Sequence, residues 1–161
     1  MMRRLLLVLA LLGCSNTDAP SAPPGVQAKL QVSDDPEDFT KGNQFSLLAT
    51  TSLYVRVQVP SLPETTMIHL SILDPDGALF HQEHIPYTRL DQETMVDNPL
   101  FHQPMLAWHA EKIDGGWAVL RGVPIRGTRF TSLVHADGMW TVEAVIDGLA
   151  GKLSTTVILQ P

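Results

Sequence analysis

Imidazole and thioether side chains gather in the middle of the chain, where together they could bind a soft metal ion. His81 and His84 are separated by two residues, and His102 precedes Met105 by three positions. Imidazole nitrogen and thioether sulfur are both ligands that copper accepts. In a helix His81 and His84 would share a face, whereas in a strand they would point to opposite faces. These four residues define a candidate copper site, and separate, solvated or singly hydrogen-bonded histidines are the other interpretation.

The remaining motifs favour a protein without catalytic chemistry and without a cofactor. The sequence contains no Gly-x-Ser-x-Gly nucleophile motif, no His-Glu-x-x-His metal motif and no glycine-rich phosphate loop. Its formal net charge is −6, so it lacks the basic surface that would displace counterions from nucleic-acid phosphates. We therefore expect a non-enzymatic protein that binds no nucleic acid, with copper handling by the histidine and methionine set as the alternative function.

The single cysteine, Cys14, follows a short apolar run near the N-terminus. Arg3 and Arg4 precede the apolar residues Leu5–Leu12, and the small Gly13 stands directly before the cysteine. A positive segment, an apolar run too short to span a bilayer and a small residue are the layout of a secretory signal. The sequence therefore predicts export from the cytoplasm.

Residues 11–14, Leu-Leu-Gly-Cys, resemble the lipobox of bacterial lipoproteins. The resemblance implies that residues 1–13 are a signal peptide cut off before Cys14, and that the thiol and the new amine carry acyl chains. Two or more such chains hold a protein stably at a membrane. By the same resemblance, Ser15 after the cysteine favours transport to the outer membrane. We expect a lipid-anchored protein of the cell envelope, attached to the membrane through Cys14.

Residues 14–27 are rich in proline and contain almost no large apolar side chain. Pro20, Pro23 and Pro24 are followed by Gly25. Such a segment cannot bury enough surface to offset the entropy of ordering, and proline keeps it extended. We interpret residues 14–27 as a lipidated flexible tether that holds a folded domain away from the membrane.

From residue 28 to residue 161 the dominant hydrophobic pattern has a period of two. Apolar and polar residues alternate over 53–59, 68–72, 140–146 and 153–159. One apolar and one polar face are typical of half-buried antiparallel strands. Turn sequences rich in Asp, Gly and Pro separate the runs, and no amphipathic helix is evident. The sequence predicts an all-β domain over 28–161, an antiparallel β-sandwich of about seven or eight strands.

The C-terminal third resembles the last strands of bacterial immunoglobulin-like domains. The resemblance rests on Val123–Thr128, on Asp137-Gly138-Met139-Trp140-Thr141-Val142 and on the Asp147-Gly148 turn before the final run. It implies an immunoglobulin-like fold in which Trp140 occupies an inward aromatic position. A fold of this kind does not by itself specify a function.

The segment from Pro86 to Pro104 has a weak strand pattern, and we expect a long loop there, with at most a helical turn near Arg89 to Asp97. Long loops in compact domains are often functional. Large apolar side chains in and beside this segment define a possible partner surface: Met95, Leu100, Phe101 and Trp108. We therefore expect a non-catalytic binding or assembly domain, an accessory of an envelope complex for secretion, motility or surface assembly.

Overall fold

The computed structural model describes residues 28–98, 102–128 and 137–161. The expected signal peptide, Cys14 and the expected tether lie outside the described residues, as do Leu100 and Phe101 of the expected partner surface. The described part of the chain consists of strands and turns, without a helix. The prediction of an all-β fold is confirmed.

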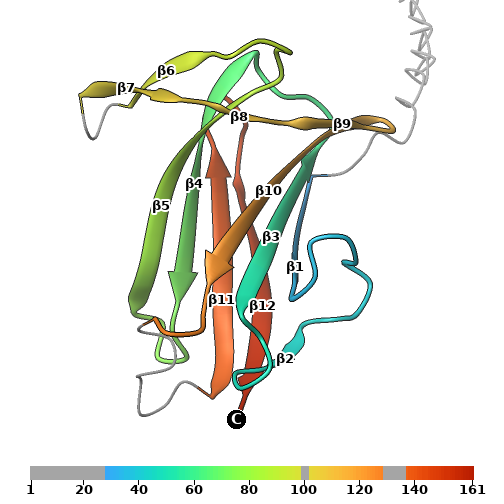
Figure 1. Ribbon diagram of the computed structural model, residues 1–161, viewed down its shortest axis with the longest axis vertical. Coiled ribbons are helices and arrows are strands. Elements are labelled where there is room, and N and C mark those ends of the chain that lie inside the picture. The colour runs from blue at the N-terminus through green and yellow to red at the C-terminus, as the bar shows by residue number, and fades with distance from the viewer. Residues whose placement is uncertain (1–27, 99–101, 129–136) are drawn as a thin grey trace, which may run out of the picture.

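The strands form two main sheets and one separate ribbon (Figure 1). A four-stranded sheet has the order β1-β3-β10-β9, a six-stranded sheet has the order β2-β12-β11-β4-β5-β8, and β6 pairs only with β7. All pairings are antiparallel except β2 with β12 and β5 with β8. The bounds are β1 (Lys29–Ser33), β2 (Gln44–Ser46), β3 (Ser52–Val59), β4 (Thr65–Leu73), β5 (Leu79–Thr88), β6 (Met95–Asn98), β7 (Gln103–Leu106), β8 (Trp108–His109), β9 (Glu111–Ile113), β10 (Gly116–Pro124), β11 (Gly138–Ile146) and β12 (Lys152–Gln160).

The core lies between the two main sheets, because each long strand turns its apolar face inward. Along β3, buried residues alternate strictly with partly exposed ones, and β11 places Trp140 inside with 1% of its surface exposed. One continuous apolar cluster contains Val55 and Val57 from the smaller sheet together with Leu70 and Trp140 from the larger. The period-two pattern therefore predicted β3, β4, β11 and β12 and their buried faces correctly, but it did not indicate the long strands β5 and β10.

The described residues contain twelve strands, more than the seven or eight that the sequence predicted. The additional ones are short, and their side chains show little alternation of burial. In β8, for example, both Trp108 and His109 are exposed. β2, β8 and β9 form because longer neighbouring strands supply hydrogen-bonding partners, whereas the short strands β6 and β7 pair with each other. A pattern of buried faces does not reveal strands of this kind.

The expectation of a long loop or helical turn from Pro86 to Pro104 is wrong. β5 extends to Thr88, and β6 and β7 form an antiparallel hairpin in which Met95 lies opposite Leu106. Near the end of this hairpin His102 has a φ of 50°, a left-handed conformation that non-glycine residues seldom adopt. The hairpin pairs with no main sheet, so its residues lack the regular burial that marks a core strand.

The chain crosses from the larger sheet to the smaller one through β7, β8 and β9 (Figure 1). On the way β8 pairs with β5 only at Tyr87 and Thr88. Among the described residues, no strand pairs with this edge of β5 from Leu79 to Pro86. An open strand edge therefore lies beside the crossover.

Candidate functional site

A groove of about 290 Å³ follows the open edge of β5. We call it the β5 groove, and it is lined by Gln82, Glu83, His84, Ile85, Pro86, Met105, Trp108 and Arg121. The residues come from β5, from the hairpin strand β7, from β8 and from β10, so both main sheets and the hairpin contribute. The groove thus exists only because the crossover brings β7 and β8 against β5.

An ion pair connects the two sheets at the groove. Arg121 Nε donates to Glu83 Oε2 at 2.7 Å, and Glu83 Oε1 lies 3.0 Å from His81 Nε2. Burial alone would raise the pKa of Glu83, but hydrogen bonds and charge from Arg121 and His81 outweigh it and lower the pKa. The Arg121 pKa is raised, chiefly by the same hydrogen bond. The pair therefore remains charged and fixes β10 to β5 beside the groove.

Arg121 also orients the exposed aromatic residue of the groove. Its guanidinium lies 5.2 Å from the ring centroid of Trp108, a cation–π arrangement. Trp108 nevertheless keeps 54% of its surface exposed. A tryptophan that is held in place and yet exposed is typical of residues that anchor protein interfaces.

Tyr87 forms a second link between the sheets below the groove. It is almost completely buried, and its hydroxyl donates to the Leu120 carbonyl oxygen of β10 at 2.9 Å. Burial raises the pKa of Tyr87 to about 12, while the charge of Arg121 lowers it by a smaller amount. The hydroxyl therefore stays protonated under ordinary conditions and holds β5 against β10.

The hairpin presents further apolar surface next to Trp108. Met95 and Leu106 lie directly opposite each other on β6 and β7, and they are 58% and 52% exposed. We call Met95, Leu106 and Trp108 the docking surface. The sequence had indicated Met95 and Trp108 but not Leu106. Leu106 stands two residues before Trp108, and side chains two residues apart in an extended segment point to the same side, so this spacing could have indicated it.

The inner side of the hairpin is anchored by polar contacts. Asn98 is 1% exposed, and its side-chain amide donates to the Met105 sulfur at 3.1 Å. In addition, the Ala107 amide donates to the Thr94 carbonyl at 2.8 Å, extending the pairing beyond β7. These contacts give the docking surface a defined shape on the hairpin.

The open edge of β5 carries features that oppose pairing with another strand. Pro86 lacks an amide hydrogen, and Glu83 points inward as a charged residue, opposite the buried Leu70. Proline and inward-pointing charges are devices by which natural sheets prevent edge-to-edge association. The groove is therefore better suited to a side chain than to an added strand.

The structure does not bring together His81, His84, His102 and Met105. His81 bonds Glu83 on the core-facing side of β5, whereas His84 lies on the outer face, where its ring contacts His69 of β4. His84 and Met105 both line the β5 groove, whereas His102 lies just before β7 and does not line it. Within residues 28–98, 102–128 and 137–161, no group of three or more His, Cys, Asp or Glu side chains is arranged to hold a metal ion.

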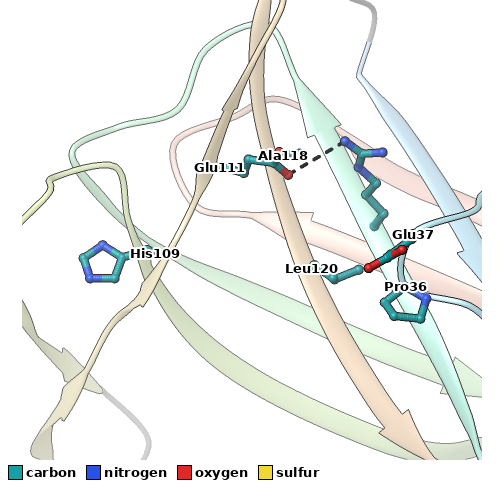
Figure 2. Close-up of a pocket in the computed structure, with 7 residues that line it drawn as sticks. Pro36, Glu37, His109, Glu111, Ala118 and Leu120 are labelled. Carbon is teal, nitrogen blue, oxygen red and sulfur yellow. Dashed lines mark ion pairs between the residues drawn. The ribbon is translucent and has the colours of Figure 1, made fainter.

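A second pocket of about 330 Å³ lies on the outer face of the four-stranded sheet, lined by Pro36, Glu37, Arg56, His109, Glu111, Ala118 and Leu120. Arg56 already faces Glu111 at 4.0 Å and the ring of Phe39 at 5.6 Å. Figure 2 shows His109 apart from Glu37 and Glu111, and its Nδ1 donates to the Leu90 carbonyl instead. The charged groups do not converge on one point, so this pocket is the weaker candidate.

Comparison with protein-family models and with curated proteins finds no match to this chain. In the part of the chain that the structure describes, no helix is long and apolar enough to cross a membrane.

Proposed function

We propose that this protein is a lipid-anchored, non-catalytic binding protein of the bacterial cell envelope. Lipid on Cys14 holds an immunoglobulin-like β-sandwich at the outer membrane, and the domain serves as an accessory of a larger envelope assembly for secretion, motility or surface assembly. The anchor is supported by the lipobox-like residues 11–14. The fold is supported by two facing sheets with antiparallel long strands and by Trp140 buried between them.

The docking surface is the observation that carries the binding role. Met95, Leu106 and Trp108 are each more than half exposed, although burying a large apolar side chain contributes about 1.5–3 kcal/mol. Their exposure leaves that free energy for association with another surface. The β5 groove beside Trp108 has room for an apolar side chain of the partner, and Arg121 and Glu83 satisfy each other at its wall.

The position of the docking surface indicates where the partner lies. Figure 1 shows the hairpin at the same end of the domain as the start of β1, where the chain arrives from residues 14–27. With the tether attached to lipid through Cys14, the domain stays within about 40 Å of the membrane surface, because an extended proline-rich chain spans about 3.1 Å per residue. We therefore propose that the occupant of the docking surface is a membrane protein of the same assembly.

Site-specific photo-crosslinking in the native bacterium tests this function. A photoreactive residue at Leu106 is expected to give one discrete adduct with a membrane protein, and Trp108→Ala is expected to weaken it at least tenfold. Leu48, which is 78% exposed in another part of the domain, is the control position and should give no such adduct. Equal adducts from both positions, or none from Leu106, would overturn the docking proposal.

The anchor has its own test. Labelled palmitate should enter the protein, and Cys14→Ala should abolish the label and release the chain from the membrane fraction. Unchanged fractionation of Cys14→Ala would overturn the lipid anchor without affecting the docking result.

A further inference from the structure

Two histidines face each other on the outer surface of the six-stranded sheet. His69 of β4 lies directly opposite His84 of β5 in the antiparallel register. Their Nδ1 atoms are 2.5 Å apart, and the ring centroids are 4.8 Å apart with an interplanar angle of 70°. The two nitrogens are within hydrogen-bond distance, so one must donate its proton and the other must present a lone pair.

The carboxylate of Asp147 determines which nitrogen that is. Its Oδ1 lies 3.0 Å from His69 Nε2. An ionised carboxylate only accepts, so His69 Nε2 donates to it, and in the neutral imidazole Nδ1 is then the acceptor. The donated proton therefore belongs to His84 Nδ1. A carboxylate that holds the outer N–H of a histidine is the common second partner of a metal-binding imidazole.

We propose that His69 and His84 form a two-histidine site for a late first-row transition-metal ion, with Cu²⁺ the preferred ion and Asp147 orienting His69. The ion takes the place of the donated proton, and that proton moves from Nδ1 to Nε2 of His84, so both rings stay neutral. Metal–imidazole bonds are about 2 Å long, so the two Nδ1 atoms must separate by about 0.3 Å to bind the ion side by side at a right angle, and by about 1.5 Å to bind it from opposite sides. Both side chains are partly exposed, which leaves the rings room to turn.

Imidazole ligands and the order of affinities among divalent ions favour Cu²⁺ over Zn²⁺ and Ni²⁺. Two protein ligands leave coordination positions open, because the described residues supply no third His, Cys, Asp or Glu at the ion. Water or a ligand from outside the chain completes the coordination. This site shares only His84 with the set predicted from the sequence, and it does not rest on the docking function.

Titration of the full chain in detergent with CuSO₄ tests the site, followed by calorimetry and electron paramagnetic resonance. We expect one Cu²⁺ per chain with two equatorial nitrogens. His69→Ala and His84→Ala should each lower the affinity more than tenfold and remove one nitrogen from the spectrum. Asp147→Asn should lower it about 10- to 100-fold with both nitrogens retained.

His109→Ala is the matched control, because His109 is a single histidine on the other side of the molecule and should bind as the wild type does. Wild-type affinity in both His69→Ala and His84→Ala would overturn the proposal, as would an equal loss in His109→Ala. Should either alanine variant lose its thermal unfolding transition, His69→Gln and His84→Gln retain a polar side chain and give the same two outcomes.

Discussion

Replacement of Tyr87 by phenylalanine tests whether the two sheets are joined by a buried, protonated hydroxyl at the groove. Below pH 10 the variant loses the hydrogen bond to the Leu120 carbonyl oxygen, which contributes about 1 kcal/mol. We therefore expect Tyr87→Phe to be less stable than the wild type by about that amount at pH 8.

The same comparison reverses at high pH. Burial raises the pKa of Tyr87 from 10.0 to about 12 in the folded protein. Because a tenfold change in acidity corresponds to about 1.4 kcal/mol, ionisation costs roughly 3 kcal/mol more in the folded than in the unfolded chain. When the pKa of a group is higher in the folded than in the unfolded protein, its contribution to the free energy of unfolding is complete below the pKa of the unfolded state. This contribution is lost as the pH rises through the pKa of the folded state. The wild type should thus lose about 2 kcal/mol relative to the variant between pH 8 and pH 12.

Urea unfolding of both proteins from pH 8 to pH 12 measures this difference. The two curves of unfolding free energy against pH should cross near pH 11, at about the point where the ionisation penalty equals the lost hydrogen bond. Lysine titration is common to both proteins and cancels in the difference. A constant difference over the whole range, or tyrosinate absorbance from Tyr87 appearing near pH 10 in the folded protein, would refute the reasoning.

Three further substitutions probe the groove and the strands that form it. Arg121→Met leaves the half-buried Glu83 without its cation and should lower the free energy of unfolding by about 2 kcal/mol in urea at pH 7. Because the pKa of Glu83 is lowered in the folded protein, the ion pair stabilises only while Glu83 is ionised, and the difference should disappear as the pH falls through that pKa. Gly116→Ala places a Cβ 2.2 Å from the Val59 carbonyl oxygen, so the free energy of unfolding should fall by about 2–4 kcal/mol, which thermal unfolding detects as a lower melting temperature. Trp108→Ala should change stability by less than about 1 kcal/mol because the ring is 54% exposed, while weakening the partner adduct at least tenfold. A stability cost as large as that of a core tryptophan would contradict the assignment of Trp108 to the surface.

The all-β fold and four of the long strands, β3, β4, β11 and β12, could be predicted from the sequence because burial on one face imposes a strict alternation of side chains. The run from Leu53 to Val59 shows this directly, since every second residue is buried in the structure. The hairpin could not be predicted in this way, because Met95 and Leu106 are apolar but exposed. An exposed apolar residue has the same sequence signal as one in a core, and only the tertiary structure distinguishes them.

The Glu83–Arg121 and His69–His84 pairs could not be predicted from the sequence for a different reason, because they depend on the register of the β4–β5 hairpin. Asp74 and Gly77 form the expected turn between β4 and β5, with the Gly77 amide donating to the Asp74 carbonyl at 2.9 Å. Leu73 pairs with Leu79, and Ile72 then pairs with His81, so Phe80 is an extra residue on β5. Sequence patterns predict that a turn occurs here, but they do not predict a bulge one residue later.

This bulge determines the chemistry on both faces of β5. Without the bulge, the register set by the Leu73–Leu79 pair would continue along both strands and place Glu83 opposite His69 on the outer face. His84 would then point toward the core, because a shift of one residue exchanges the two faces of a strand. With the bulge, Glu83 points inward and reaches Arg121 across the two sheets, and His84 points outward to His69. Phe80 packs edge-on against Trp140 at 5.0 Å between ring centroids, so the core itself supports the altered register. The ion pair beside the groove and the histidine pair on the opposite face therefore have one common structural cause.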